Sequence, residues 1–114
     1  MKVKKFNVYL ADLNPRFGTE PGKVRPVVVL QTNLLNDIHH PSTIVCPVTT
    51  NVAHGADLLR VRLSKKGTAL KKDSDVLVDQ IRSIDNKRLV RHIGELAPGE
   101  RQKLADNLKI ILFE

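Results

Sequence analysis

Side chains able to do chemistry stand at the ends of apolar segments in three parts of the chain. A guanidinium and a carboxylate precede the apolar run 27–30, two hydroxyls close "TIVCPVTT", and a carboxylate and an amide close "VLVDQ". These residues are Arg25 and Glu20, Thr49 and Thr50, and Asp79 and Gln80. Strand ends that meet would form one polar pocket, and an arginine beside hydroxyl and carboxyl groups suits a phosphate. Taken singly, each residue also has an ordinary structural interpretation, as a salt bridge or a turn cap.

Pro26 restricts where Arg25 can lie. Proline is tolerated at the first residue of a strand, and it pushes the residue before it out of helical geometry into an extended conformation. The valines that follow form a short apolar run typical of a strand buried on both faces. We therefore expect Arg25 at the mouth of a core strand, at the edge of a pocket, behind a loop that contains Gly18 and Gly22.

The sequence signatures of several other chemistries are absent. There is no P-loop, no dinucleotide-binding glycine motif, no H-E-x-x-H and no cysteine pair for zinc. None of the four histidines shows the spacing of metal ligands, and no serine stands in a nucleophile elbow. Cys46 is the only cysteine and lies in an apolar run, so we expect a buried, inert thiol and no intrachain disulfide. The sequence predicts no metal and no cofactor.

Length and charge indicate the class of protein and of partner. The 114 residues fit a single domain, 1–114, and the net charge of +7 favours an anionic partner such as nucleic acid, an acidic protein or a membrane surface. No signal peptide and no run of membrane-spanning length is visible, so we expect a reduced, cytoplasmic protein without a membrane partner. Six cations and no acid lie between residues 60 and 72. This segment is either a solvated hairpin or a binding surface for phosphates or an acidic tail.

The hydrophobic pattern predicts a mainly β domain closed by one helix. Strands are expected at 6–13, 25–31, 43–49, 57–63, 76–81 and within 88–96, with Pro47 placing the third strand at an edge or in a bulge. In the strand 76–81, Asp79 shares a face with apolar residues, so it needs a partner or a raised pKa. From Pro98 onward, Leu104, Leu108 and Ile111 fall at helical spacing. Short strands with bends at proline indicate a small, strongly bent sheet or barrel.

The segments "VYLADLNPRFGTEPGKVRPVVVLQ", "TIVCPVTTN" and "VLVDQIRSID" together resemble the MazF/PemK (Kid) toxins of bacterial toxin–antitoxin systems. The resemblance covers nearly the whole chain, in order and with fitting spacing. It implies an SH3-like small β-barrel with a C-terminal helix, the fold that MazF and CcdB proteins share. It also implies a homodimer, a metal-independent endoribonuclease that cuts single-stranded RNA at short sequences, and inhibition by a cognate antitoxin with an acidic tail.

The resemblance also suggests roles for particular residues. Arg25 and Thr49 match a pair assigned to catalysis in relatives, and Glu20 and Asp79 match carboxylates with a catalytic or RNA-contacting role. Positions that match the substrate groove are Thr19, Thr50 and Gln80. The chain departs from the pattern twice, because some members carry His at Thr19 and Arg at Leu77. The catalytic set of those members therefore does not transfer whole.

The chemistry of the groups then suggests how they would work on RNA. Attack of the 2′-hydroxyl on the adjacent phosphate needs a proton acceptor and stabilisation of the growing negative charge. Arg25 suits the second role and not the first, because arginine essentially never deprotonates. Glu20 is the first candidate for the base and Asp79 the second, each needing a raised pKa, with the loop residue His54 as an outsider.

Two other functions remain open from the sequence. One is a CcdB-like inhibitor of DNA gyrase, although those proteins end in Trp-Gly-Ile and this chain contains no tryptophan. The other is a noncatalytic binding module built on the same small barrel, in which the polar pocket residues would be structural.

Overall fold

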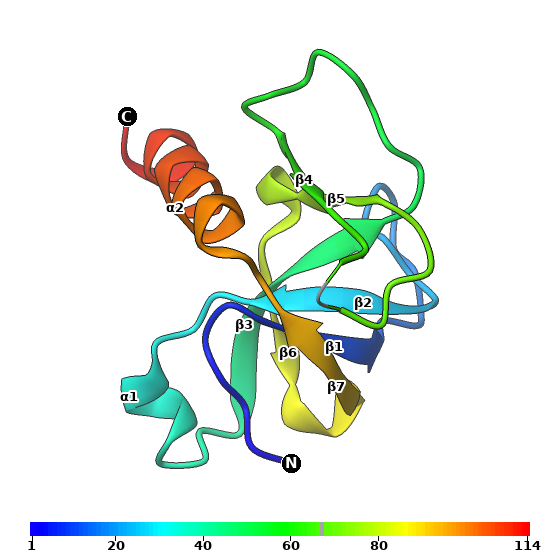
Figure 1. Cartoon of the computed structure of the whole chain (residues 1–114). Helices are drawn as coiled ribbons and strands as arrows, with labels where there is room; N and C mark the ends of the chain where they lie inside the picture. The colour runs from blue at the N-terminus through cyan, green and yellow to red at the C-terminus, as the bar shows by residue number, and fades with distance from the viewer. Residues whose placement is uncertain (67) are drawn as a thin grey trace.

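The computed structural model describes residues 1–66 and 68–114. Within these residues the chain forms seven strands, two α-helices and two 3-10 turns (Figure 1). In chain order they are β1 (Asn7–Asp12), β2 (Val24–Val29), α1 (Asn33–Asn36), β3 (Ser42–Thr49), β4 (Arg60–Leu63), β5 (Ser74–Leu77), η1 (Val78–Gln80), β6 (Arg82–Asp85), η2 (Asn86–Arg88), β7 (Leu89–Glu95) and α2 (Pro98–Phe113).

The strands form one antiparallel sheet that curls toward closure. Their order is β4-β5-β3-β2-β1-β7, and β6 pairs with the first half of β3. The two ends of the sheet approach each other where Thr68, in the connection from β4 to β5, forms a bridge with Gly94 of β7. A Cβ atom on Gly94 would lie 2.8 Å from the Cα of Thr68, so only glycine permits this approach. The predicted barrel-like fold is confirmed, with a sheet that is not fully closed.

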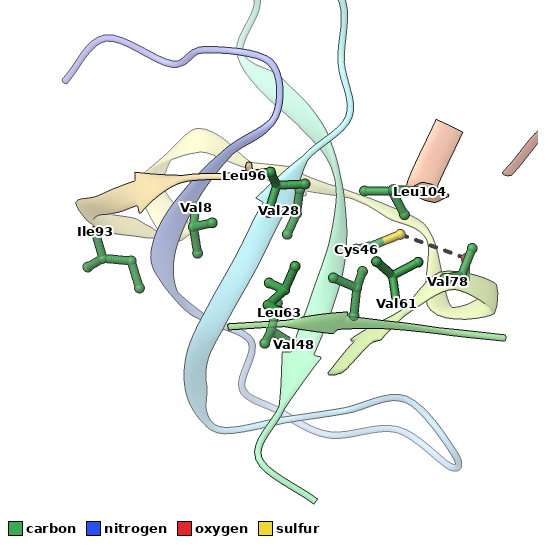
Figure 2. Packing of buried hydrophobic residues seen from close by; sticks show 11 residues of the cluster. Val8, Val28, Cys46, Val48, Val61, Leu63, Val78, Ile93, Leu96 and Leu104 are labelled. Atoms are coloured by element: carbon green, nitrogen blue, oxygen red, sulfur yellow. Dashed lines mark hydrogen bonds between the residues drawn. The ribbon is translucent and has the colours of Figure 1, made fainter. Parts of the chain in front are cut away.

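The central strand β2 separates two apolar clusters, as the valine run predicts. Val28 packs in a core with Val8, Cys46 and Leu104, and Figure 2 shows these side chains among the strands, with Leu104 coming from α2. Val27 and Val29 point to the other face and pack in a second core. All three valines are fully buried. Because both faces of β2 are covered, its backbone is a rigid support for the residues at its start.

The C-terminal helix α2 follows the predicted pattern. Leu104 is fully buried, and Leu108 and Ile111 pack against the same core. Glu100 compensates for Ala97, which cannot cap the helix: its carboxylate accepts hydrogen bonds from the amides of Ala97, at 2.8 Å, and Ser64, at 3.0 Å. In the part of the chain that the structure describes, no helix combines the length and the apolar character of a membrane span.

Three sequence expectations about the strands were wrong. Pro47 lies in a central strand. Proline is tolerated there because β3 pairs with β6 only up to Val45 and with β5 only from Val48, so Pro47 has no partner in either strand. The expected strand 76–81 ends at Leu77, where the chain tightens into η1. The expected strand 57–63 begins only at Arg60, because a turn precedes it in which Ala56 accepts hydrogen bonds from the amides of Leu59 and Arg60.

Candidate active site

The loop between β1 and β2 supplies one wall of the candidate site. Its base is closed by two hydrogen bonds, from the amide of Leu13 to the carbonyl of Lys23 and from the amide of Lys23 to Oδ1 of Asn14, both 2.8 Å. Within the loop, a Cβ atom on Gly22 would lie 2.7 Å from the Cβ of Arg16. Glycine therefore lets the two halves of the loop touch, which places Arg16 near the start of β2.

Arg25 is held at the start of β2, as predicted. Its Nε donates a 2.8 Å hydrogen bond to the carbonyl of Gly22, and the side chain is half-buried. Partial burial lowers the pKa of Arg25, and the nearby positive charge of Arg16 lowers it further. An anion bound here would relieve that repulsion. Among the described residues no carboxylate pairs with Arg25, so both of its terminal nitrogens are available to a ligand.

Glu20 shares a hollow with Arg25. This hollow has a volume of about 400 Å³, and its lining includes Arg16, Thr19, Glu20 and Arg25. The carboxylate of Glu20 is 46% exposed and lies 3.9 Å from Nη1 of Arg82 in β6. Glu20 therefore pairs with Arg82 and not with Arg25, although Glu20 and Arg25 line the same hollow.

Thr49 belongs by alternation to the face of β3 that carries Val45, and Arg25 to the face of β2 that carries Val27, but Thr49 does not line the hollow of Arg25. The ladder between β2 and β3 ends at the pair Val27 and Pro47, and continuing its register by two residues brings Arg25 opposite Thr49. Facing residues in antiparallel strands project from the same side, roughly 4.5–5.5 Å apart at Cβ where the strands stay paired. The Oγ1 of Thr49 accepts a 3.1 Å hydrogen bond from the amide of Asn51, which leaves its hydroxyl hydrogen free to donate.

Asp79 and Gln80 line a second hollow, of about 380 Å³, and not the one around Arg25. Thr19 and Pro21 line both, so the loop before β2 forms the ridge between the two. The expectation of a buried Asp79 was wrong. The turn η1 ends the alternation of β5, buries Val78 and leaves Asp79 exposed to solvent.

Thr50 is separated from the other candidates. It lines a third hollow, on the opposite face of β2, together with Leu10, Pro26 and the cations Lys71, Lys72 and Arg91. The structure therefore brings together Arg25, Glu20 and Thr19, places Asp79 and Gln80 next to them across the ridge, and sets Thr50 apart. His54, the third candidate for the general base, is exposed in the loop after β3 and lines neither of the first two hollows.

The basic segment 60–72 divides into two parts. Arg60 and Arg62 form ion pairs with the buried carboxylate of Asp75, at 3.2 and 2.5 Å. These two arginines are therefore structural. The remaining cations are exposed at the surface: Lys65, Lys66, Lys71 and Lys72.

Comparison with known proteins now identifies the family. Residues 4–112 match the family model described as PemK-like, MazF-like toxin of type II toxin-antitoxin systems. The chain is 36% identical over 110 residues to "Endoribonuclease MazF" of Staphylococcus epidermidis, a match that covers 96% of this chain and 91% of that protein. The chain belongs to this toxin family.

Solved structures of similar shape agree with this membership. MazF (Form-I) from Deinococcus radiodurans superposes with a TM-score of 0.84 at 24% identity, covering 100% of this chain and 99% of that one. A mycobacterial endoribonuclease in complex with its cognate antitoxin superposes with a TM-score of 0.73 at 18% identity, covering 97% and 93%. These likenesses confirm the predicted fold.

Sequence reasoning missed two cations of the candidate site. Arg16 shares the hollow of Arg25, and Arg82 lies against Glu20. Neither stands at a distinctive spacing from the other candidates along the chain. The small residue at Gly22 was the one signal, because a glycine inside a loop permits close packing of the kind that brings Arg16 in.

Proposed function

We propose that this protein is a metal-independent endoribonuclease toxin that cuts single-stranded RNA at short sequences. The observation that carries the proposal is the guanidinium of Arg25, immobilised by the carbonyl of Gly22 and unpaired among the described residues. Membership of a toxin family and the endoribonuclease named among its relatives support the same activity.

The proposed reaction begins with the 2′-hydroxyl of the substrate. Glu20 accepts its proton, the 2′ oxygen forms a bond to phosphorus, and the bond from phosphorus to the 5′ oxygen breaks. The leaving oxygen takes up a proton, so the products carry a 2′,3′-cyclic phosphate and a 5′-hydroxyl. Arg25 binds the non-bridging oxygens, where a fixed donor contributes about 3–4 kcal/mol to the transition state. Thr49 donates a hydroxyl hydrogen bond to the same phosphate.

The neighbouring hollow extends the site along the substrate. Asp79 and Gln80 can contact bases or riboses, and Thr19 stands on the ridge between the two hollows. Such polar groups at fixed positions read single-stranded RNA by its exposed base edges. We place Asp79 second to Glu20 as the base because it lies across this ridge from Arg25.

The proposed partners are a cognate antitoxin and a second copy of the chain. Four exposed lysines in the segment 60–72 would attract an acidic antitoxin tail, and a relative of the same fold has been solved with its antitoxin. Leu112 and Phe113 at the end of α2 are 47% and 81% exposed, apolar surface that a second copy can cover. The proposed place of action is the cytoplasm, where the RNA substrate is found.

The test is digestion of a long RNA by purified protein in EDTA, with the 5′ ends then mapped. The proposal expects discrete cuts with 5′-hydroxyl ends. Glu20→Gln should abolish cleavage while Asp79→Asn retains it, and the reverse result would move the base to Asp79. Binding of RNA without cleavage would contradict the nuclease and support a binding module.

A further inference from the structure

A row of polar residues crosses four neighbouring strands on the face that carries Arg25. Arg62 of β4 lies opposite Asp75 of β5, and Asp75 lies opposite Thr49 of β3. The ladder between β2 and β3 ends at Val27 and Pro47, and the same register carried on by two residues would set Arg25 of β2 opposite Thr49. Residues that face each other across antiparallel strands project from the same side, so these side chains form one line across the sheet.

Asp75 is the buried member of this row. Its side chain is 1% exposed. The two oxygens accept hydrogen bonds from the amide of Ala53 at 2.8 Å, from Nη1 of Arg60 at 3.2 Å and from Nε of Arg62 at 2.5 Å. A buried carboxylate needs such partners, and here two guanidiniums and one backbone amide satisfy it.

The same cluster binds the backbone of the segment that follows Thr49. Arg60 donates from Nη1 to the carbonyl of Asn51 at 3.1 Å, and Arg62 donates from Nη2 to the carbonyl of Ala53 at 3.2 Å. Together with the Ala53 amide, three backbone groups of residues 51–53 are held. Asn51 in turn donates its amide to Oγ1 of Thr49.

We infer that Asp75 is a positioning residue that orients the Thr49 hydroxyl toward the phosphate bound by Arg25. The inference rests on the proposed function. Asp75 fixes Arg60 and Arg62, the arginines fix residues 51–53, and the amide of Asn51 occupies one lone pair of the Thr49 oxygen. The hydroxyl hydrogen of Thr49 is thereby left for the substrate. Ala53 and Arg60 also line the hollow of Asp79, so the same cluster shapes that wall.

The bonding pattern separates this role from simple support of the sheet. A carboxylate that served only to join β4 to β5 would need no more than the arginines opposite it. Here three of the hydrogen bonds of the cluster reach the loop 51–53, which belongs to neither strand. The loop is the element that would move without Asp75, because β3, β4 and β5 keep their backbone ladders.

The first experiment compares Asp75→Asn with a matched carboxylate elsewhere. Glu100→Gln is the control, because Glu100 also accepts two backbone amides but does so at the start of α2. With RNA cleavage measured well below the melting temperature of each variant, Asp75→Asn should lower kcat about tenfold or more and change KM less than about threefold, since misplacing a reacting group by about 1 Å can cost 10²-fold. Glu100→Gln should leave both constants unchanged.

The second experiment asks whether Asp75 acts through Thr49. In a Thr49→Val background the hydroxyl is gone, so Asp75→Asn should lower kcat less than threefold further. If Asp75→Asn lowered kcat by the same factor in wild type and in Thr49→Val, the inference would be overturned. Should Asp75→Asn fold poorly, Arg62→Ala takes its place, because it removes the hydrogen bonds to Asp75 and to the Ala53 carbonyl. Arg62→Ala should likewise lower kcat less in the Thr49→Val background than in wild type.

A third measurement separates failure of this inference from failure of the proposed function. Amide hydrogen exchange at Ala53, followed without RNA, should accelerate at least tenfold in Asp75→Asn and stay unchanged in Glu100→Gln. Unchanged exchange at Ala53 in Asp75→Asn would overturn the inference whatever the activity. Wild-type protein that cuts no RNA would instead refute the nuclease itself.

Discussion

Replacing Asp75 by asparagine should also measure how much the buried cluster stabilises the fold. The carboxylate is 1% exposed and accepts three hydrogen bonds, two of them from arginines whose side chains are 25% and 40% exposed. Hydrogen bonds to a charged group contribute about 1.5–3 kcal/mol each to stability. Because solvent screens the partly exposed arginines, their two hydrogen bonds should contribute amounts near the lower value. Asparagine keeps one oxygen and loses the charge. We expect a loss of about 3 kcal/mol, which lowers Tm by roughly 10–15 °C.

The pH dependence of this loss has a definite sign. Burial acts to raise the pKa of Asp75, but the amide of Ala53 and the guanidiniums of Arg62 and Arg60 outweigh it, so the pKa is lowered. A lowered pKa in the folded state stabilises the protein above the unfolded value of about 3.9 and loses that stabilisation as pH falls through the folded value. The difference between wild type and Asp75→Asn should therefore be constant from pH 5 to 7 and shrink below about pH 4.

Urea unfolding followed by circular dichroism checks both statements. Asp106→Asn is the matched control, because Asp106 is exposed on α2, and its free energy of unfolding should stay within about 0.5 kcal/mol of wild type. The reasoning would be refuted by an Asp75→Asn variant as stable as this control at pH 7. A difference that persists undiminished at pH 3 would refute the role of the charge.

Three further predictions concern the closure of the sheet, the thiol and the lysines. Gly94→Ala should destabilise the protein by about 2–4 kcal/mol because its Cβ meets Thr68, whereas Gly99→Ala, with open space around it, should not; thermal melts compare the two. Burial, reinforced by the charge of Asp79, raises the pKa of Cys46 to about 12, so a thiol reagent at pH 8 should label it only in urea. If the exposed lysines bind RNA phosphates, Lys71→Ala and Lys72→Ala should each make the slope of log binding constant against log salt concentration less steep by about 0.7. Fluorescence anisotropy measures this slope, which Arg62→Ala should leave unchanged.

Local patterns in the sequence were enough to predict the parts of the fold that depend on neighbouring residues. The valine run gave a strand buried on both faces, Pro26 gave an extended Arg25, and the apolar spacing after Pro98 gave α2. Each of these is decided within a few residues by backbone sterics or by periodicity.

The parts that failed depend on contacts between distant segments. Pro47 is central because of where β5 and β6 pair with β3, which its own neighbours do not reveal. Asp79 is exposed because the chain turns after Leu77. The ion pairs of Asp75 with arginines 13 and 15 residues away arise only from the register of β4 against β5. The site was therefore predictable as a set of strand ends, and its division into separate hollows was not.

The most direct test of the account compares Arg25→Ala with wild type on a long RNA in EDTA, scored by 5′-hydroxyl ends. Arg25 should contribute about 3–4 kcal/mol to the transition state, so the variant should cut 10²- to 10³-fold more slowly while its thermal melt stays close to that of wild type. An Arg25→Ala protein that is folded and cuts RNA at the wild-type rate would contradict the central claim that this guanidinium binds the scissile phosphate.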